Sequence, residues 1–151
     1  MANANVFDLP KDHPLSNFAA ELPGILKSIG HSEMYGVELV APSDDKPAPH
    51  TTLIILQKFL RANAGDLAGA RTQLTNALKW RKEYNPRAAL DEVYPTKKFG
   101  GLGYVTKIKG AEETKNDEDI ATFNIYGAAA NDPKNTFGDT DAFVRWRVAL
   151  M

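Results

Sequence analysis

Apolar residues in the first part of the chain recur every three or four positions, which is the spacing of an amphipathic helix. Pro23 interrupts this repeat, and we expect it to kink or divide the helix because its ring clashes with the preceding turn. Gly30 follows at a position suited to a helix end. The segment 42–50 carries three prolines among charged residues, which is typical of a loop or linker. The repeat consists of Leu15, Phe18, Ala19, Leu22, Ile25, Leu26 and Ile29.

Two more helical repeats, separated by a short break, predict a helical hairpin. We expect Thr51 and Thr52 to cap the first helix, which continues to about residue 62. Asp66 is placed to cap the second helix, over about residues 67–84. Asn85 should end it, because a residue before proline is displaced from the α region.

The pattern changes after residue 86 to the alternation of β-strands. Residues 104–108 and 120–126 are expected to pair as an antiparallel hairpin around an acidic loop, 110–119, and Tyr126 is expected to end the second strand. Asp139 predicts the start of a last helix over 142–151. The chain therefore falls in the mixed α/β class. We divide it into an N-terminal helical extension and linker (1–50), a helical hairpin (51–90) and the first part of an α/β lobe (91–151).

The C-terminal third has too few elements to cover its own apolar residues. A two-stranded hairpin is marginally stable in water unless other elements pack on it. The apolar repeat of the last helix also continues to Met151 without glycine, proline or a cationic last turn to stop it. We therefore expect the sequence to be truncated.

Composition excludes several classes of protein. The 151 residues include 18 Lys and Arg against 19 Asp and Glu, a net charge of -1 that argues against a nucleic-acid binder. Cysteine is absent, which excludes disulfide scaffolds and thiolate metal sites. No apolar run reaches the roughly 18 residues that a transmembrane helix needs, and the first residues do not resemble a signal peptide. We expect a cytoplasmic protein.

The residue types that usually carry catalysis or bind metals are scattered. His13, His31 and His50 lie far apart beside turns, without metal-ligand spacing. The glycine-rich segment 100–103 lacks the Gly-Lys-Ser/Thr ending of a phosphate loop, so we interpret it as a flexible connection. The acidic residues of 112–119 lack the ligand spacing of a calcium loop. Neither an enzyme nor a metal site within this chain is predicted.

Two residues are the candidates for a binding site. Arg147 shares one face of the last predicted helix with Phe143 and Leu150, and a guanidinium on an apolar face needs an anionic or buried partner. Tyr126 offers an aromatic ring with a polar tip, which suits a cavity wall. The alternative for the pair is an arginine that extends to water and a tyrosine that packs in a core.

The segment 53–86 resembles the N-terminal helical module of CRAL-TRIO lipid-binding proteins, through the run 58–62 (KFLRA), the break after it and the ending 78–81 (LKWR). The segments 34–39 (MYGVEL), 122–127 (TFNIYG) and 143–151 (FVRWRVALM) are similar to a narrower fungal branch, the heme-binding phosphatidylinositol transfer proteins grouped as the fifth homologue of the yeast lipid-transfer protein. The resemblance covers roughly residues 15–151, about half of such a protein.

The resemblance implies a non-enzymatic carrier that transfers phosphatidylinositol between membranes, cytoplasmic and peripheral on the endoplasmic reticulum or microsomal membrane. It also implies a heme b pocket in the α/β lobe. Tyr126 and Arg147 match positions that line this pocket, and Arg147 would pair with a heme propionate. The family's iron ligand lies in a His-x-Tyr stretch that these 151 residues lack, so an iron ligand is expected beyond Met151.

Two other functions are open at this point. One is a heme-binding or heme-sensing stress protein with little lipid transfer. The other is an adaptor whose helical module binds a protein partner.

Overall fold

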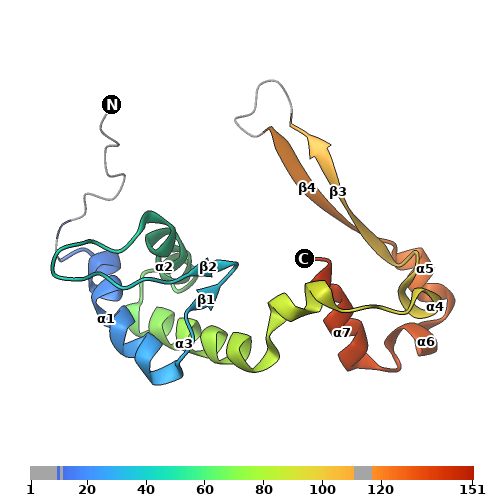
Figure 1. The fold of residues 1–151 in the computed structure, drawn as a ribbon, viewed down its shortest axis with the longest axis horizontal. Helices are drawn as coiled ribbons and strands as arrows, with labels where there is room; N and C mark the ends of the chain where they lie inside the picture. The colour runs from blue at the N-terminus through green and yellow to red at the C-terminus, as the bar shows by residue number, and fades with distance from the viewer. Residues whose placement is uncertain (1–9, 11, 111–116) are drawn as a thin grey trace. The chain divides into compact units, whose positions relative to one another are not determined.

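The computed structural model describes residues 10, 12–110 and 117–151, and its contacts divide the chain into two compact units at the Asn85–Pro86 junction. The N-terminal unit is mainly helical, and the C-terminal unit combines short helices with a long β-hairpin (Figure 1). The predicted mixed α/β class is thus confirmed.

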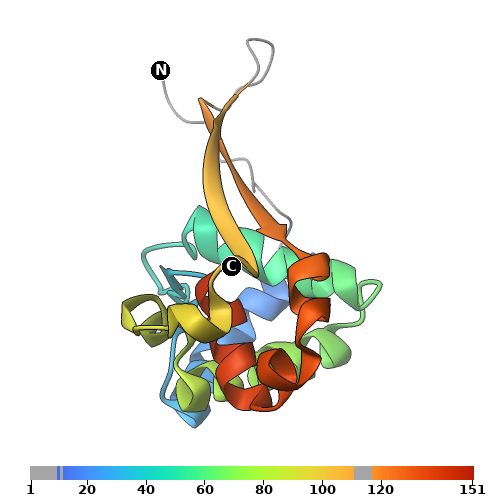
Figure 2. The ribbon, with the colours of Figure 1, turned by 90° about the vertical axis from the view of Figure 1, so that its right-hand side faces the viewer.

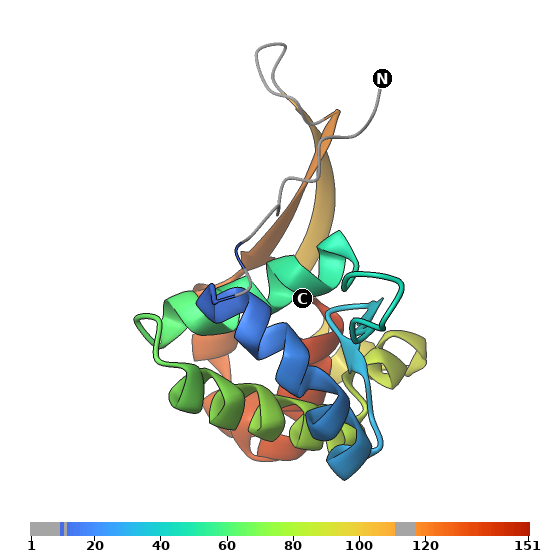
Figure 3. The same cartoon turned by 90° about the vertical axis from the view of Figure 1, so that its left-hand side faces the viewer.

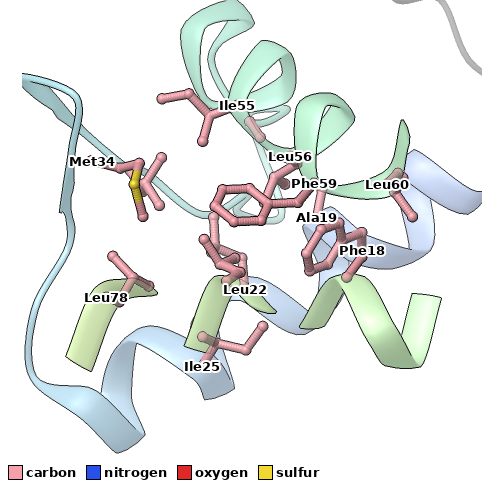
Figure 4. Packing of buried hydrophobic residues seen from close by; sticks show 14 of the residues in the cluster. Phe18, Ala19, Leu22, Ile25, Met34, Ile55, Leu56, Phe59, Leu60 and Leu78 are labelled. Atoms are coloured by element: carbon pink, nitrogen blue, oxygen red, sulfur yellow. The ribbon is translucent and has the colours of Figure 1, made fainter. Parts of the chain in front are cut away.

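Three helices form the N-terminal unit, and each packs against the other two (Figure 3). They are α1 (Pro14–Ile29), α2 (His50–Ala62) and α3 (Leu67–Tyr84). Phe18 and Leu22 of α1 are completely buried beside α2 and α3 (Figure 4). All three helices present their apolar stripe to one shared core, as the helical spacing predicted. The core consists of Leu15, Phe18, Ala19, Leu22, Ile25, Ile29, Met34, Leu39, Ala48, Ile55, Leu56, Phe59, Leu60, Ala70, Leu74 and Leu78.

The helix ends of this unit confirm some predictions and correct others. Gly30 ends α1 in the left-handed conformation (φ 63°), and the Asp66 carboxylate caps α3 by accepting from the amides of residues 68 and 69. Helix α1 is not divided at Pro23, because Leu22 and Ile25 on either side are held in the same core. The predicted cap at Thr51 and Thr52 is wrong. Helix α2 begins at His50, and the Thr52 hydroxyl instead accepts from the Val40 amide (3.1 Å).

A buried ion pair ties a small hairpin, β1 (Glu33–Met34) and β2 (Val37–Glu38), to α3. Arg81 donates through Nε and Nη2 to the two oxygens of Glu33 (2.9 and 2.7 Å), and the Gly36 amide donates to the same carboxylate (2.6 Å). Burial raises the pKa of Glu33, but these hydrogen bonds and the charges of Arg81 and His31 outweigh it, so the pKa is lowered overall.

The C-terminal unit begins with a 3-10 helix (Pro86–Asp91) and the short helix α4 (Thr96–Phe99). Strands β3 (Gly103–Lys109) and β4 (Glu118–Asn124) then pair antiparallel, with Tyr104 opposite Phe123 and Lys109 opposite Glu118. Helices α5 (Tyr126–Asn131), α6 (Pro133–Phe137) and α7 (Thr140–Ala149) follow at the base of the hairpin (Figures 1 and 2).

The predicted antiparallel hairpin is confirmed, with bounds shifted by one or two residues. Glu118 and Asp119, assigned from sequence to the loop, belong to β4. Residues 112 and 113 of the predicted acidic loop lie outside the described residues. The three-part division at residues 50 and 90 stays a prediction.

The core of the C-terminal unit is small. It consists of Phe99, Leu102 and Trp146, with the Phe99 and Trp146 rings stacked 5.2 Å apart. Arg145 of α7 donates to Glu92 (2.9 Å), and its hydrogen bond is the main cause of a lowered Glu92 pKa. This pair joins α7 to the segment that follows the 3-10 helix.

Candidate ligand cavity

A cavity of about 310 Å³ lies at the base of the hairpin, inside the C-terminal unit. The end of β4, the residue before β3, and helices α5, α6 and α7 contribute its walls, which are mainly apolar. The lining residues are Leu102, Asn124, Ile125, Tyr126, Ala129, Phe137, Phe143, Trp146 and Arg147.

The sequence positions Arg147 through the start and the spacing of α7. Asp139 caps this helix by accepting from the Ala142 amide (3.1 Å), and this hydrogen bond, followed by that of Lys98, lowers the Asp139 pKa. Phe143 and Arg147 are four residues apart and therefore lie on one face, as predicted, and both line the cavity.

The guanidinium of Arg147 is the cationic group of the cavity. Its central carbon lies 5.8 Å from the centroid of the Trp146 ring, and its Nη1 atom is buried without a hydrogen-bond partner. A buried cationic donor without a partner is costly unless an anion satisfies it. The arrangement therefore suits an anionic group on an otherwise apolar ligand.

Tyr126 lies on the same cavity, but its place in the fold differs from the prediction. Strand β4 ends at Asn124, and Tyr126 begins α5 instead of ending the strand. The antiparallel pairing continues for one residue past the strand, because the Ile125 amide donates to the Leu102 carbonyl (2.9 Å), and the chain then turns into the helix. Tyr126 is 80% exposed, so its ring borders the cavity from the solvent side.

Sequence reasoning missed Leu102, Asn124 and Phe137 as lining residues. It also misjudged the glycine-rich segment 100–103, which is packed in place. A Cβ at Gly103 would lie 2.7 Å from the Phe123 carbonyl oxygen and 3.4 Å from the Trp146 ring. Only a glycine admits an approach this close. Gly103 was therefore the residue in the sequence that could have indicated that the backbone of β3 packs against β4 and α7 here.

The described residues contain no group of three or more histidine, cysteine or acidic side chains that could hold a metal ion. Among them, too, no helix combines the length and the apolar character needed to cross a bilayer. What the cavity offers chemically is an apolar, largely aromatic wall with one guanidinium.

Comparison with curated proteins finds relatives of high identity. The chain is 51% identical over 140 residues to phosphatidylinositol transfer protein SFH5 of Phaeosphaeria nodorum, covering 93% of the chain and 40% of that protein. It is 50% identical over 144 residues to the sfh5 protein of Neosartorya fischeri (95% and 32%). With the SFH5 protein of Cryptococcus neoformans, identity is 47% over 149 residues (95% and 47%).

Among solved structures, the crystal structure of Sfh5 matches with a TM-score of 0.74 and 26% identity, covering 93% of the chain and 49% of that structure. No family model matches the chain. The chain thus spans between 32% and 47% of the length of the curated relatives given above. The resemblance stated from the sequence is confirmed by these relatives and by the shared fold.

Proposed function

We propose that the chain forms part of a non-enzymatic carrier of phosphatidylinositol. The proposal follows from its homology to SFH5-type phosphatidylinositol transfer proteins of the CRAL-TRIO family. The carrier would be cytoplasmic and would contact the endoplasmic reticulum or microsomal membrane peripherally. In this proposal the C-terminal unit contributes ligand-binding wall, and the N-terminal unit is the helical module that precedes it.

The buried Nη1 atom of Arg147, which has no hydrogen-bond partner and belongs to a residue that lines an apolar cavity, is the observation that carries the proposal. Phosphatidylinositol combines an anionic phosphate with apolar chains. Arginine recognises phosphate through charge-assisted, often bidentate, hydrogen bonds. The aromatic wall of Phe137, Phe143 and Trp146 supplies the apolar surface beside it.

The size of the cavity limits what these residues can hold alone. Its 310 Å³ lies at the lower end of the roughly 300–1,000 Å³ typical of small-molecule sites. A two-chain lipid needs more wall than this cavity provides. We therefore assign to it the part of the ligand next to the phosphate, and the remaining wall to residues outside this chain.

Transfer of labelled phosphatidylinositol between vesicles by the full-length protein tests the proposal. We expect Arg147→Gln to reduce the transfer rate by about tenfold or more, because a charge-assisted contact contributes about 1.5–3 kcal/mol. Lys134→Gln is the matched control: it removes one exposed positive charge from α6 of the same unit and should leave transfer unchanged. Absence of transfer by the unsubstituted protein would refute the proposal.

Heme b is the second candidate ligand, favoured by the same cavity. Trp146, Phe143 and Phe137 offer aromatic, apolar surface to a porphyrin, and Arg147 fits a propionate as well as a phosphate. When bound, the heme would supply a redox-active iron. Tyr126 and Arg147 would line its site, and the iron ligand would come from a residue outside this chain.

An absorption spectrum of the full-length protein purified with added hemin tests this candidate. We expect a Soret band that Arg147→Gln weakens and that the Lys134→Gln control preserves. A full-length protein that transfers phosphatidylinositol but shows no Soret band would exclude heme and retain the lipid. The opposite result would favour the heme-binding protein with little lipid transfer.

A further inference from the structure

The N-terminal unit contains a cavity of its own, of about 680 Å³, which is larger than the ligand cavity of the C-terminal unit. It lies between α1 and α3, which pack side by side (Figure 3). Its volume falls within the roughly 300–1,000 Å³ typical of small-molecule sites. Both walls belong to helices that share the core of this unit, and the C-terminal unit contributes no lining residue. Small and polar side chains make up most of the lining, among them Glu21, Gly24, Ser28, Arg71, Thr75 and Asn76.

A charged pair with an unsatisfied oxygen lies on this cavity. Nη1 of Arg71 lies 3.6 Å from Oε2 of Glu21, a distance that makes an ion pair but is too long for a hydrogen bond. The Oε2 atom is buried and has no hydrogen-bond partner. A buried carboxylate oxygen without a donor is costly, and a ligand that donates to it removes this cost. Because the two charges offset each other, the pair favours a neutral ligand over an anion or a cation.

Gly24 keeps the cavity open at a cost to α1. It lies inside this helix, where glycine is less favourable than every residue except proline. A Cβ built on Gly24 would meet nothing within 4 Å beyond its own turn of helix, so close packing does not require a glycine here. A larger side chain would instead extend into the cavity that Gly24 lines. Preserving this space is therefore a physical reason for the glycine.

The remaining polar groups indicate the chemistry of the ligand. Thr75 and Asn76 of α3 add a hydroxyl and a carboxamide, each of which can donate and accept hydrogen bonds. A hydroxyl group of a ligand matches the charged pair as well, because it can donate to Glu21 and accept from Arg71 at the same time. A ligand with several hydroxyls on a small ring engages all of these groups together. An apolar ligand would leave them unsatisfied.

We propose that this cavity binds a small neutral polyol, of the size of a monosaccharide or a cyclitol. Glu21 accepts from the hydroxyls of the ligand, Arg71 donates to them, and Gly24 provides the space. The cavity shares no lining residue with the one around Arg147, so the inference is independent of the lipid or heme proposed for that cavity.

Saturation-transfer NMR titration of the full-length protein with myo-inositol, and separately with D-glucose, tests this site. We expect saturable binding of at least one of them, with a dissociation constant of about 10 mM or tighter. Glu21→Gln should weaken binding by about tenfold or more, because the ligand hydroxyl loses a charged acceptor. Glu83→Gln is the matched control, since it removes an exposed carboxylate elsewhere on α3 and should leave binding unchanged.

Two substitutions at Gly24 separate binding from folding. Gly24→Leu should abolish polyol binding by filling the cavity, whereas Gly24→Ala adds only a methyl group and should retain it. Neither variant should lower the unfolding temperature, because leucine and alanine both favour a helix more than glycine does. Absence of saturable binding of both polyols overturns the proposal, as does undiminished binding by Gly24→Leu or by Glu21→Gln.

Discussion

The N-terminal unit buries sixteen apolar residues in one continuous core, whereas the core cluster of the C-terminal unit contains three. The N-terminal helices bury most of their apolar residues against one another, with Trp80 of α3 left 45% exposed. In the C-terminal unit, by contrast, both strands of the hairpin and the cavity wall leave apolar side chains in contact with solvent. The N-terminal unit therefore has a continuous core of its own, whereas the C-terminal unit leaves apolar side chains available to a ligand.

This difference connects stability with function. Buried apolar area is the dominant favourable term in folding, so the N-terminal unit has the larger reserve of stability. The exposed apolar residues of the C-terminal unit are the ones available for binding, because they are not already used in a core. The same residues that leave this unit with a small core give it its cavity.

Removing a core aromatic ring from each unit should have the largest effect on stability, and the effect should differ between the two units. Phe18→Ala and Phe99→Ala each remove a buried aromatic ring, at an expected cost of about 3–5 kcal/mol in the free energy of unfolding. We expect the N-terminal unit to stay folded at reduced stability. The C-terminal unit should lose its native packing, because Phe99 is one of the three residues of its core cluster.

The two tryptophans report on the units one at a time, since Trp80 lies in α3 and Trp146 in α7. Denaturant titration followed by fluorescence, with the other tryptophan replaced by phenylalanine, measures each unfolding transition. If Phe99→Ala left the Trp146 transition intact while Phe18→Ala abolished that of Trp80, the proposed order of stability would be reversed.

Breaking the Glu33–Arg81 ion pair should have the next largest effect, restricted to the N-terminal unit. Glu33→Gln leaves the Arg81 guanidinium, 12% exposed, without its carboxylate, and we expect a loss of about 3 kcal/mol. The folded-state pKa of Glu33 is lowered, so the pair contributes fully above the unfolded pKa, near 4.5, and its contribution is lost as pH falls through the lowered folded value.

Measuring the free energy of unfolding from neutral to acid pH checks this direction of the pH dependence. The unsubstituted chain should lose N-terminal stability below about pH 4.5, and Glu33→Gln should show a flatter profile there. Glu38→Gln, on the neighbouring strand, is the control. A steeper acid loss in the Glu33→Gln variant would contradict the assignment.

Removing a helix cap should have the smallest effect. Asp66→Ala deletes the carboxylate that accepts from the amides of Ala68 and Gly69, at an expected cost of about 1 kcal/mol. Asp44→Ala, an exposed residue outside the helices, should change the unfolding free energy little. Chemical denaturation followed at Trp80 measures both, and equal values would show that the cap contributes nothing.

The candidate site was predictable in part. Arg147 stood out because a guanidinium occurred on an apolar helical face, and the structure leaves its Nη1 without a partner on a cavity. Tyr126 was found for a different reason, its position at the end of an apolar strand, and the structure places it at the start of a helix. Leu102 and Asn124 could not be found, because neither lies on a periodic pattern that points to a ligand.

Local patterns in the sequence determined the helices of the N-terminal unit, the antiparallel hairpin and the start of α7. Helical and strand periodicity and capping side chains act over a few residues, so they can be read without knowledge of the fold. Tertiary structure alone decided the path of the chain through Pro23, the packing of Gly103 against Trp146 and the turn at Ile125 that brings Tyr126 beside Arg147. Those features depend on contacts between residues distant in sequence, whose energies outweigh local preference.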